Sequence, residues 1–364
     1  MTPKFNVVAE RGHVDLELWY NNRRASDRSW SVDESQWLFP YQYVRHVPGI
    51  RRFPLDLLGK ARPDVLVSLY AEPCFVVGAA IARSRGSRTV HWVERTSDRW
   101  VQRRRWKEWS KRQVLPRADA ILTTGEDGRR YVEDYGVDGA RVHTINYFSD
   151  VKFFGAAADA VEDQRAVLRD RQGVNGVTFI YVGRLWLGKG IDTLLTAFTL
   201  AQSRSPQTLS LMLVGDGVDE AELRAMCKTQ LIPNVHFLGF RQKTDIAECY
   251  AMADVFVFPT LGDPFGQVVE EAMASGLPVI STTAAGEIGE RIIPGYNGEL
   301  VPPGDVEQLA QKMVQMAGSD DPRGTMGRNA REHVQSLTEE LWAQRFETMV
   351  NAVLSGEVAG HTSG

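Results

Sequence analysis

The chain has 364 residues, of which 43% are hydrophobic, and a formal net charge of −4. That length is too great for one ordinary domain and predicts two domains of roughly 150–200 residues, each able to bury a core. No apolar run approaches the roughly 18 residues that a membrane-spanning helix needs, and charged residues stand near the N-terminus where a signal peptide would be apolar. These features exclude an integral membrane protein and predict a cytoplasmic one. The three cysteines are scattered without metal-ligand spacing and are assigned no function.

Charge is divided unevenly along the chain. Residues 1–150 carry an excess of about six positive charges, and the remainder carries an excess of about ten negative charges. The basic half is therefore expected to meet an acidic acceptor, a phosphate or a membrane surface, although an asymmetry of this size also arises by chance.

Helix and strand patterns alternate through the first 150 residues. Thr2-Pro3 predicts the start of a helix that stops at Gly12, and aromatic residues crowd the following stretch up to residue 53. Such rings either stack on sugars or anchor the core and loops. Further on, strands are predicted over 64–70 and 89–94, with a helix over 73–83 between them. This alternation indicates a parallel sheet.

Ligands of parallel sheets gather beyond the carboxyl ends of the strands, which draws attention to Glu94, Arg95 and His91. His91 lies inside its predicted strand and is equally well explained as a core histidine. Glu94 is therefore the preferred candidate for a catalytic residue at this edge of the sheet.

A basic segment follows at 100–115, where six Lys and Arg residues alternate with three tryptophans. A helix of this composition could lie on anionic lipid or bind a phosphorylated acceptor. The alternative is a solvated face with its tryptophans packed inward. Nucleic acid is not expected as a partner, because the whole protein is acidic and carries no recognisable binding motif.

The second half repeats the strand and helix alternation. Residues 155–176 are expected to link the domains through a helix, and 177–182 to form the first strand of the second domain. Gly183-Arg184-Leu185 and Lys189-Gly190 then place an arginine and a lysine on one loop, where both can converge on a diphosphate. Gly215-Asp-Gly217 superficially suggests a dinucleotide fingerprint, but the third glycine is missing and the dehydrogenase interpretation is rejected.

The most informative stretch begins with the predicted strand 255–258. It continues as Asp263-Pro-Phe-Gly-Gln-Val-Val-Glu-Glu271-Ala-Met-Ala-Ser-Gly-Leu-Pro. Backbone N–H groups near Phe265, Gly266 and Gln267, at the start of the predicted helix, are expected to point at an anion. Asp263 and Glu271 could accept hydrogen bonds from the paired hydroxyls of a ribose or hexose.

This stretch resembles the E-x7-E signature of retaining glycosyltransferases of the GT-B fold, family 4 (glycosyl transferases group 1), with Asp263 in place of the first glutamate. The Gly183 to Gly190 loop resembles the G-R-L…K-G motif of the same family. The resemblance is strong over 117–318 and weak elsewhere. Where relatives continue with P-N-G-V-D, this chain has Asn146-Tyr-Phe-Ser-Asp150.

The resemblance implies two Rossmann-like parallel-sheet domains facing a cleft. Residues 1–150 are expected to bind the acceptor and residues 151–340 the nucleotide-sugar, while the helix in 341–364 returns to the first domain. Relatives begin with a strand and a Gly-rich loop, whereas this chain begins with the pattern of the following helix. We therefore expect the first strand to be missing, either because the true start lies upstream or because something unrecognised replaces it.

The implied activity is a hexosyltransferase that moves a sugar from a UDP- or GDP-type donor to a small-molecule, glycan or lipid-linked acceptor, with retention at the anomeric carbon. No metal and no cofactor are expected, because Arg184 and Lys189 would stabilise the departing diphosphate. By the same resemblance, Glu271 binds the ribose, Asp263 the donor sugar, and Phe240-Arg241 the nucleobase. Helical periodicity alone does not separate Glu271 from Glu270.

Two alternatives remain open at this point. One is a sugar-nucleotide-binding protein without transferase turnover. The other is an enzyme of the same fold that hydrolyses or epimerises the donor. The expected location is the cytoplasm, with a peripheral contact at the inner membrane surface.

Overall fold

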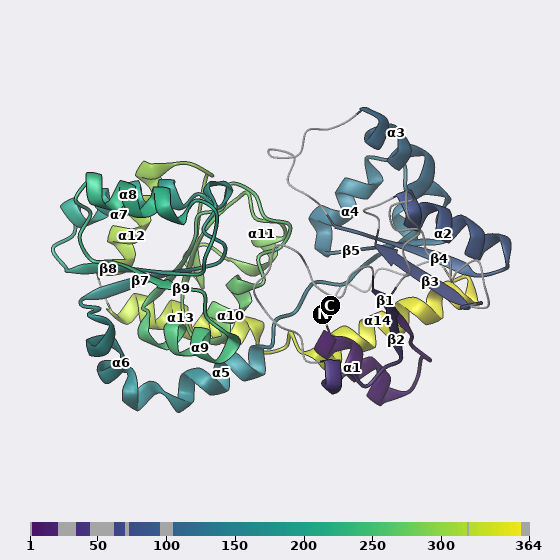
Figure 1. The fold of residues 1–364 in the computed structure, drawn as a ribbon, viewed down its shortest axis with the longest axis horizontal. Coiled ribbons are helices and arrows are strands. Elements are labelled where there is room, and N and C mark those ends of the chain that lie inside the picture. Colours follow the sequence, from purple (N-terminus) through teal and green to yellow (C-terminus); the bar gives the residue numbers. More distant parts are fainter. Residues whose placement is uncertain are drawn as a thin grey trace. The chain divides into compact units, whose positions relative to one another are not determined.

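The computed structural model describes residues 2–20, 34–43, 62–69, 73–94, 105–318 and 320–357. These residues form two compact units, and each unit has a parallel sheet flanked by helices (Figure 1). The first unit combines the described residues up to 94, 105–147 and 339–357, and the second comprises 148–318 and 320–338. The expected α/β architecture with parallel sheets is confirmed.

The second unit is built on a six-stranded sheet in which all neighbouring strands are parallel. Across the sheet lie β12 (Gly298–Val301), β11 (Val279–Thr282), β10 (Val255–Phe258), β7 (Val177–Val182), β8 (Leu209–Val214) and β9 (Val235–Gly239). Every residue of β7, β8, β10 and β11 is buried. Continuous apolar runs of this kind are typical of strands that are covered on both faces.

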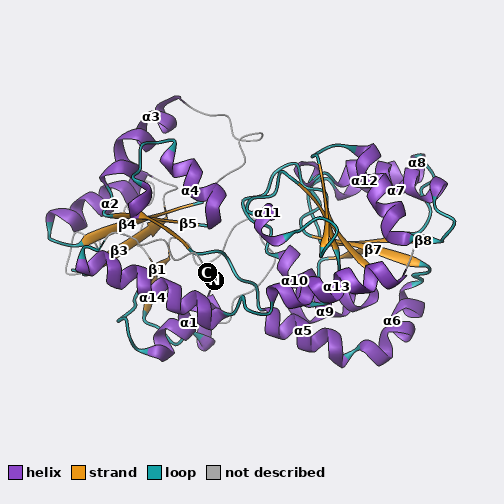
Figure 2. Ribbon diagram, turned by 180° about the vertical axis from the view of Figure 1, so that it is seen from behind, coloured by secondary structure: helices purple, strands orange, loops and turns teal. Residues whose placement is uncertain are grey.

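Helices cover both faces of this sheet (Figure 2). One face carries α7 (Ile191–Arg204), α8 (Glu220–Thr229) and α12 (Val306–Ala317), and the short helix α11 (Ile288–Arg291) follows β11. The other carries α5 (Val151–Ala160), α6 (Arg165–Gln172), α9 (Lys243–Met252), α10 (Val268–Ala274) and α13 (Asp320–Val334). Residues 155–176, expected to be a linker, thus belong to the second unit, because α5 and α6 pack against α9.

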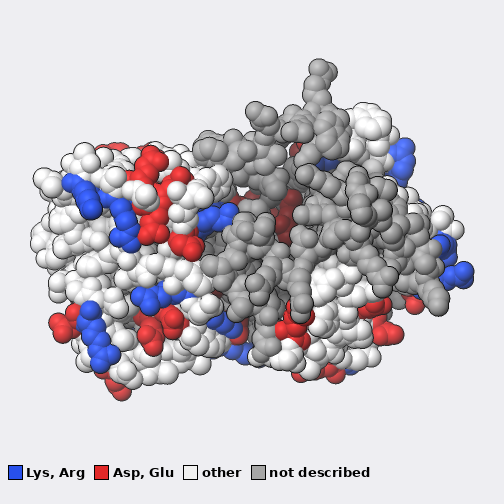
Figure 3. All heavy atoms as spheres, in the orientation of Figure 1, with Lys and Arg blue, Asp and Glu red and all other residues white. Residues whose placement is uncertain are grey.

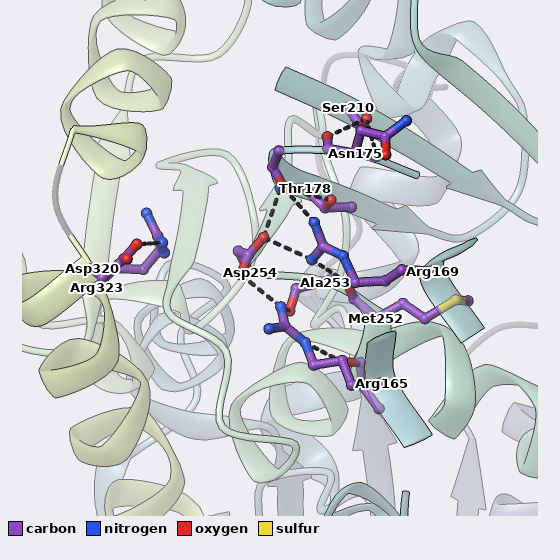
Figure 4. Close-up of polar contacts among 12 residues, drawn as sticks. Arg165, Arg169, Asn175, Thr178, Ser210, Met252, Ala253, Asp254, Asp320 and Arg323 are labelled. Atoms are coloured by element: carbon purple, nitrogen blue, oxygen red, sulfur yellow. Dashed lines mark hydrogen bonds and ion pairs between the residues drawn. The ribbon is translucent and has the colours of Figure 1, made fainter. Parts of the chain in front are cut away.

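Asp254 fastens α6 to the amino end of the sheet (Figure 4). Its carboxylate accepts hydrogen bonds from Arg165 Nη2 at 2.6 Å, Arg169 Nη1 at 3.2 Å and the Thr178 backbone N–H at 2.8 Å. Burial acts to raise the pKa of Asp254, but these positive charges and hydrogen bonds outweigh it and lower the pKa from its ordinary value. This cluster has a structural explanation and lies at the edge of the sheet opposite the predicted site residues.

The first unit contains two separate sheets within its described residues. A four-stranded parallel sheet has the order β3 (Val65–Leu69), β4 (Arg88–Val93), β5 (Ala120–Thr123) and β6 (Val142–Thr144). A short parallel pair consists of β1 (Leu18–Tyr20) and β2 (Tyr41–Tyr43). The helices are α1 (Thr2–Arg11), α2 (Pro73–Ser84), α3 (Arg105–Val114), α4 (Gly125–Glu133) and α14 (Glu339–Ser355).

The first and last of these helices, α1 and α14, pack against each other. Phe5 of α1 makes edge-to-face contacts with Trp342 and Phe346 of α14, with ring centroids 5.2 and 5.8 Å apart. Arg11 donates to both oxygens of Glu347, at 2.9 and 3.0 Å. The end of the described chain therefore belongs to the same unit as its beginning.

Acidic and basic side chains are interspersed on the face of the second unit that Figure 3 displays. Many of the positive charges counted in residues 1–150 lie outside the described residues. No helix in the described ranges is long and apolar enough to cross a membrane.

Candidate functional site

The loops after β7 and β10 meet at the carboxyl edge of the second sheet, because these strands are neighbours. From β7 the chain continues to β8 and β9 on one side, and from β10 it continues to β11 and β12 on the other. Ligands of open parallel sheets bind outside the carboxyl ends at such a reversal of strand order. A hydrogen bond from the Leu261 N–H to the Gly188 carbonyl, 3.2 Å long, joins the two loops.

The loop after β7 carries Gly183, Arg184 and Lys189. The buried Tyr181 hydroxyl donates to the Arg184 carbonyl at 2.9 Å and fixes the turn, while the Arg184 side chain is exposed. Gly190 ends the loop with φ 68°, and a Cβ there would lie 2.1 Å from the Pro259 carbonyl oxygen. Only glycine allows this approach of the two loops.

Lys189 and Asp263 form an ion pair across the two loops. Their side chains are only 18% and 17% exposed. The structure therefore brings together the residue predicted to bind phosphate and the residue predicted to bind the sugar. In this arrangement the carboxylate neutralises the lysine that a diphosphate would otherwise neutralise.

Asp263 also accepts a hydrogen bond from one of the backbone N–H groups that were predicted to bind an anion. Its Oδ1 accepts the Phe265 backbone N–H at 2.9 Å. The Phe265 N–H thus has no intrahelical partner, as expected, but the side chain two residues earlier accepts it in this structure. Gly266 has φ 72° and Gln267 is exposed, and both precede α10 directly.

Arg291 anchors the loop that follows β10 and was not predicted from the sequence. Its guanidinium is buried and donates to the carbonyls of Phe265, Gly266 and Gly286. It also lies over the Phe265 ring, 4.1 Å from the centroid. These hydrogen bonds hold the Phe265 and Gly266 carbonyls toward the protein interior beside that of Gly286, and they fix the course of the backbone from Asp263 to Gln267. An arginine in a short helix gives no sequence signal for this role.

The two neighbouring glutamates of α10 have different surroundings. Glu270 is fully buried, and its Oε2 accepts the Ser149 backbone N–H at 2.8 Å. Glu271 is partly buried and receives a hydrogen bond from the Tyr250 hydroxyl at 3.2 Å. Burial raises the pKa of Glu271 to about 7. Both glutamates have a structural partner, and Glu271 is the less buried of the two.

Gly215 and Gly217 have a packing explanation. A Cβ on Gly215 would lie 1.9 Å from the Gly183 carbonyl oxygen, and one on Gly217 would lie 2.1 Å from that of Leu185. These glycines let the loop after β8 lie directly against the loop that carries Arg184. At the end of β9, Phe240 is 39% exposed and Arg241 is partly buried.

In the first unit, His91 lies within β4 and is 3% exposed. Its Nδ1 is 2.9 Å from the hydroxyl oxygen of Ser68, its register partner on β3. Burial lowers the pKa of His91 to about 4, so the ring is neutral at pH 7. These contacts favour the core-histidine interpretation over the catalytic one.

Glu94 directly follows β4 and its side chain is exposed. The Tyr147 hydroxyl donates a hydrogen bond to Glu94 Oε1. Tyr147 follows β6 at the position where the sequence departs from the family pattern, and that departure is the signal that could have identified it. Arg95 lies outside the described residues.

Two domains with parallel sheets and a site at the carboxyl edge of one of them define an α/β protein of the GT-B class. The model for the glycosyl transferase 4-like domain matches residues 8–147, and the model for glycosyl transferases group 1 matches residues 176–319. Together the two models cover most of the chain. The protein belongs to this glycosyltransferase family.

Sequence relatives carry the names of several transferases. The D-inositol 3-phosphate glycosyltransferase of Kribbella flavida is 30% identical over 243 residues, which is 64% of this chain and 56% of the relative. The GDP-mannose-dependent alpha-mannosyltransferase of Mycobacterium tuberculosis is 38% identical over 168 residues, which is 46% of this chain and 40% of the relative. The chain spans about half the length of the curated relatives it matches.

Solved structures share the fold. Sucrose-phosphate synthase from Thermosynechococcus elongatus aligns with a TM-score of 0.75 and 22% identity, covering 98% of this chain and 92% of that one. HepE of Anabaena, solved with UDP and glucose, aligns with a TM-score of 0.76 and 19% identity, covering 96% and 95%. The GT-B fold expected from the sequence is confirmed.

Proposed function

We propose that the protein is a retaining, metal-independent hexosyltransferase that uses a UDP- or GDP-sugar. The observation that carries this proposal is the ion pair of Lys189 with Asp263 at the switch point of the second sheet, where Lys189 shares its loop with Arg184. A relative named for GDP-mannose and a fold relative solved with UDP support a nucleotide-sugar donor.

In the proposed reaction the bond between the anomeric carbon and the diphosphate oxygen breaks, and the acceptor oxygen forms the new bond. The acceptor proton leaves with the diphosphate. Negative charge builds on the departing group, where Arg184 and Lys189 stabilise it. Glu271 binds the ribose hydroxyls and Asp263 the sugar hydroxyls, and the Phe240-Arg241 loop lies beside the base. The acceptor is a small molecule, a glycan or a lipid-linked sugar.

The central experiment compares Arg184→Ala and Lys189→Ala with Lys228→Ala, an exposed lysine on α8. We expect each of the first two to lose roughly 10- to 100-fold in kcat/KM, because a charge-assisted contact contributes about 1.5–3 kcal/mol. The melting temperatures of both site variants should stay close to that of wild type. Lys228→Ala should change kcat/KM little. Unchanged turnover in both site variants would remove the proposed role.

Three further measurements separate the alternatives. Titration with UDP and GDP tests nucleotide binding, and donor consumption with and without acceptor distinguishes transfer from hydrolysis, epimerisation or simple binding. NMR of the product's anomeric proton tests retention. Activity that disappears with EDTA and returns with Mg²⁺ would contradict metal independence.

One observation supports a peripheral contact with anionic lipid. Trp109 on α3 is 66% exposed, so the inward packing considered from the sequence is wrong for this residue. Arg112, one turn later on the same helix, is also exposed. An exposed tryptophan near an exposed arginine is typical of helices that lie at a membrane interface, and the positive charge complements anionic headgroups.

A further inference from the structure

We propose that Tyr147 is a positioning residue that holds the Glu94 carboxylate in place to accept a hydrogen bond from a hydroxyl group of the acceptor. The two residues would form an acceptor subsite in the first unit. This inference rests on the proposed transferase function and names the group of the first unit that recognises the acceptor.

The geometry begins with the two strands that carry the pair. Glu94 follows β4 and Tyr147 lies three residues beyond β6, so both stand past the carboxyl ends of strands in one parallel sheet. The hydroxyl of Tyr147 donates to Glu94 Oε1. A carboxylate can accept several hydrogen bonds, and Glu94 is exposed to solvent while its partner is not.

Tyr147 is fixed by the rings and the cation around it. It is 7% exposed and stacks on Trp92, with centroids 5.7 Å apart and ring planes at 22°. Trp92 in turn stacks on Trp342 of α14 at 6.2 Å. The ammonium of Lys4, itself 2% exposed, lies 5.5 Å from the centroid of the Tyr147 ring. These contacts hold the Tyr147 ring in place with its hydroxyl directed at Glu94.

The same surroundings keep the hydroxyl protonated. Burial raises the pKa of Tyr147, and the charge of Glu94 raises it further. At neutral pH the tyrosine is a hydrogen-bond donor, so it orients the carboxylate without neutralising it. A flexible glutamate at a strand end would otherwise lose side-chain freedom each time an acceptor binds.

The test uses Tyr147→Phe, Glu94→Gln and the double variant, with UDP-glucose or GDP-mannose as donor. The acceptor is the best substrate from a panel of methyl glycosides and D-inositol 3-phosphate. Tyr135→Phe is the matched control, because the Tyr135 hydroxyl also donates to a glutamate, Glu108, in the same unit. We expect Tyr147→Phe to raise the acceptor KM by roughly 10-fold, with donor KM and UDP affinity unchanged.

The double variant distinguishes a positioning role from a structural one. If Tyr147 acts through Glu94, removing it from the Glu94→Gln protein should cause no further loss in acceptor KM. Additive losses, an equal loss in donor KM, or the same effect from Tyr135→Phe would overturn the proposal. If the chain binds nucleotide without turnover, acceptor affinity measured by titration replaces KM, and equal affinities of wild type and Glu94→Gln overturn it. Failure to bind UDP or GDP at all would instead contradict the proposed function.

Discussion

Lys189 must exchange one negative partner for another if it binds a diphosphate, because Asp263 already holds its ammonium group. Asp263→Asn removes that competitor and also the acceptor for sugar hydroxyls. We therefore predict that UDP binds the variant as tightly as wild type or more tightly, while the KM for the sugar nucleotide rises roughly 10-fold. Titration with UDP beside donor kinetics measures both. Equal losses for UDP and donor would show that Asp263 serves only to order the loop.

We expect donor binding to depend on pH through Glu271. Burial raises its pKa to about 7, so the folded protein holds the proton more tightly than the unfolded chain does. The ionised form thus lowers stability as the pH rises toward 7, yet it is the form proposed to accept hydrogen bonds from a ribose. We predict that UDP affinity increases several-fold between pH 6 and 8 and that Glu271→Gln binds weakly at both values.

The control is stability measured in parallel. Glu271→Gln should be at least as stable as wild type at pH 8, because it removes the charge that burial disfavours. A flat affinity profile for wild type would reassign the ribose contact to another residue.

Among the elements, those with continuous apolar runs or strong end signals were predictable from sequence. The strand after residue 176 and the helix beginning at Pro73 were expected where β7 and α2 lie. By contrast, α5 was obscured by an Ala-rich composition that indicated a linker. Its start is fixed by Asp150, whose side chain accepts the Phe153 N–H at 3.0 Å. A cap of one residue is easily missed when the helix itself has weak periodicity.

The residues of the candidate site also divide into those that were predicted from the sequence and those that were missed. Arg184, Lys189, Asp263 and Glu271 were predicted because they stand in motifs that resemble those of the family, and the structure places their loops together. Arg291 and Tyr147 were missed, since their partners at the site, Phe265 and Gly266 for the one and Glu94 for the other, lie 25 to 53 residues away. The contacts of Arg291 follow from the tertiary arrangement and leave no local pattern, whereas the position of Tyr147 is marked by the departure from the family's P-N-G-V-D motif.

Helix α3 carries the prediction about membranes. Wild-type protein should sediment with vesicles that contain phosphatidylglycerol and not with pure phosphatidylcholine, because exposed cations complement anionic headgroups. Trp109→Ala and Arg112→Glu should each reduce the bound fraction several-fold, while Gln113→Ala on the same helix should not. Tryptophan emission should shift to shorter wavelength on binding in wild type and in Gln113→Ala, but not in Trp109→Ala. Identical sedimentation of all variants would assign Trp109 to another contact.

At the scale of the whole molecule, the described part of the chain passes from the first unit to the second at Tyr147–Phe148 and returns at Thr338–Glu339. Each side of the first crossing is anchored within its own unit. Tyr147 donates to Glu94 in the first unit, and the Ser149 hydroxyl donates to the Gln267 carbonyl in the second at 2.9 Å. Side chains just before and after the crossing therefore connect to candidate acceptor and donor residues, respectively.

The return crossing leads into α14, whose attachment to α1 depends on Glu347. Burial acts to raise the pKa of Glu347, but hydrogen bonds from Arg11 and His13 outweigh it and lower the pKa below its ordinary value. Its contribution to stability is therefore present above the pKa of an unfolded glutamate, about 4.3, and is lost as the pH falls through the folded value.

We predict that Glu347→Gln lowers the melting temperature at pH 7 by roughly 2–4 °C. The difference should narrow as the pH approaches 4, and Glu222→Gln on the exposed face of α8 should show none. Melting curves between pH 4 and 8 measure the effect, and equal melting temperatures at pH 7 would mean that the apolar contacts of Phe5 and Trp342 suffice to hold the helices together.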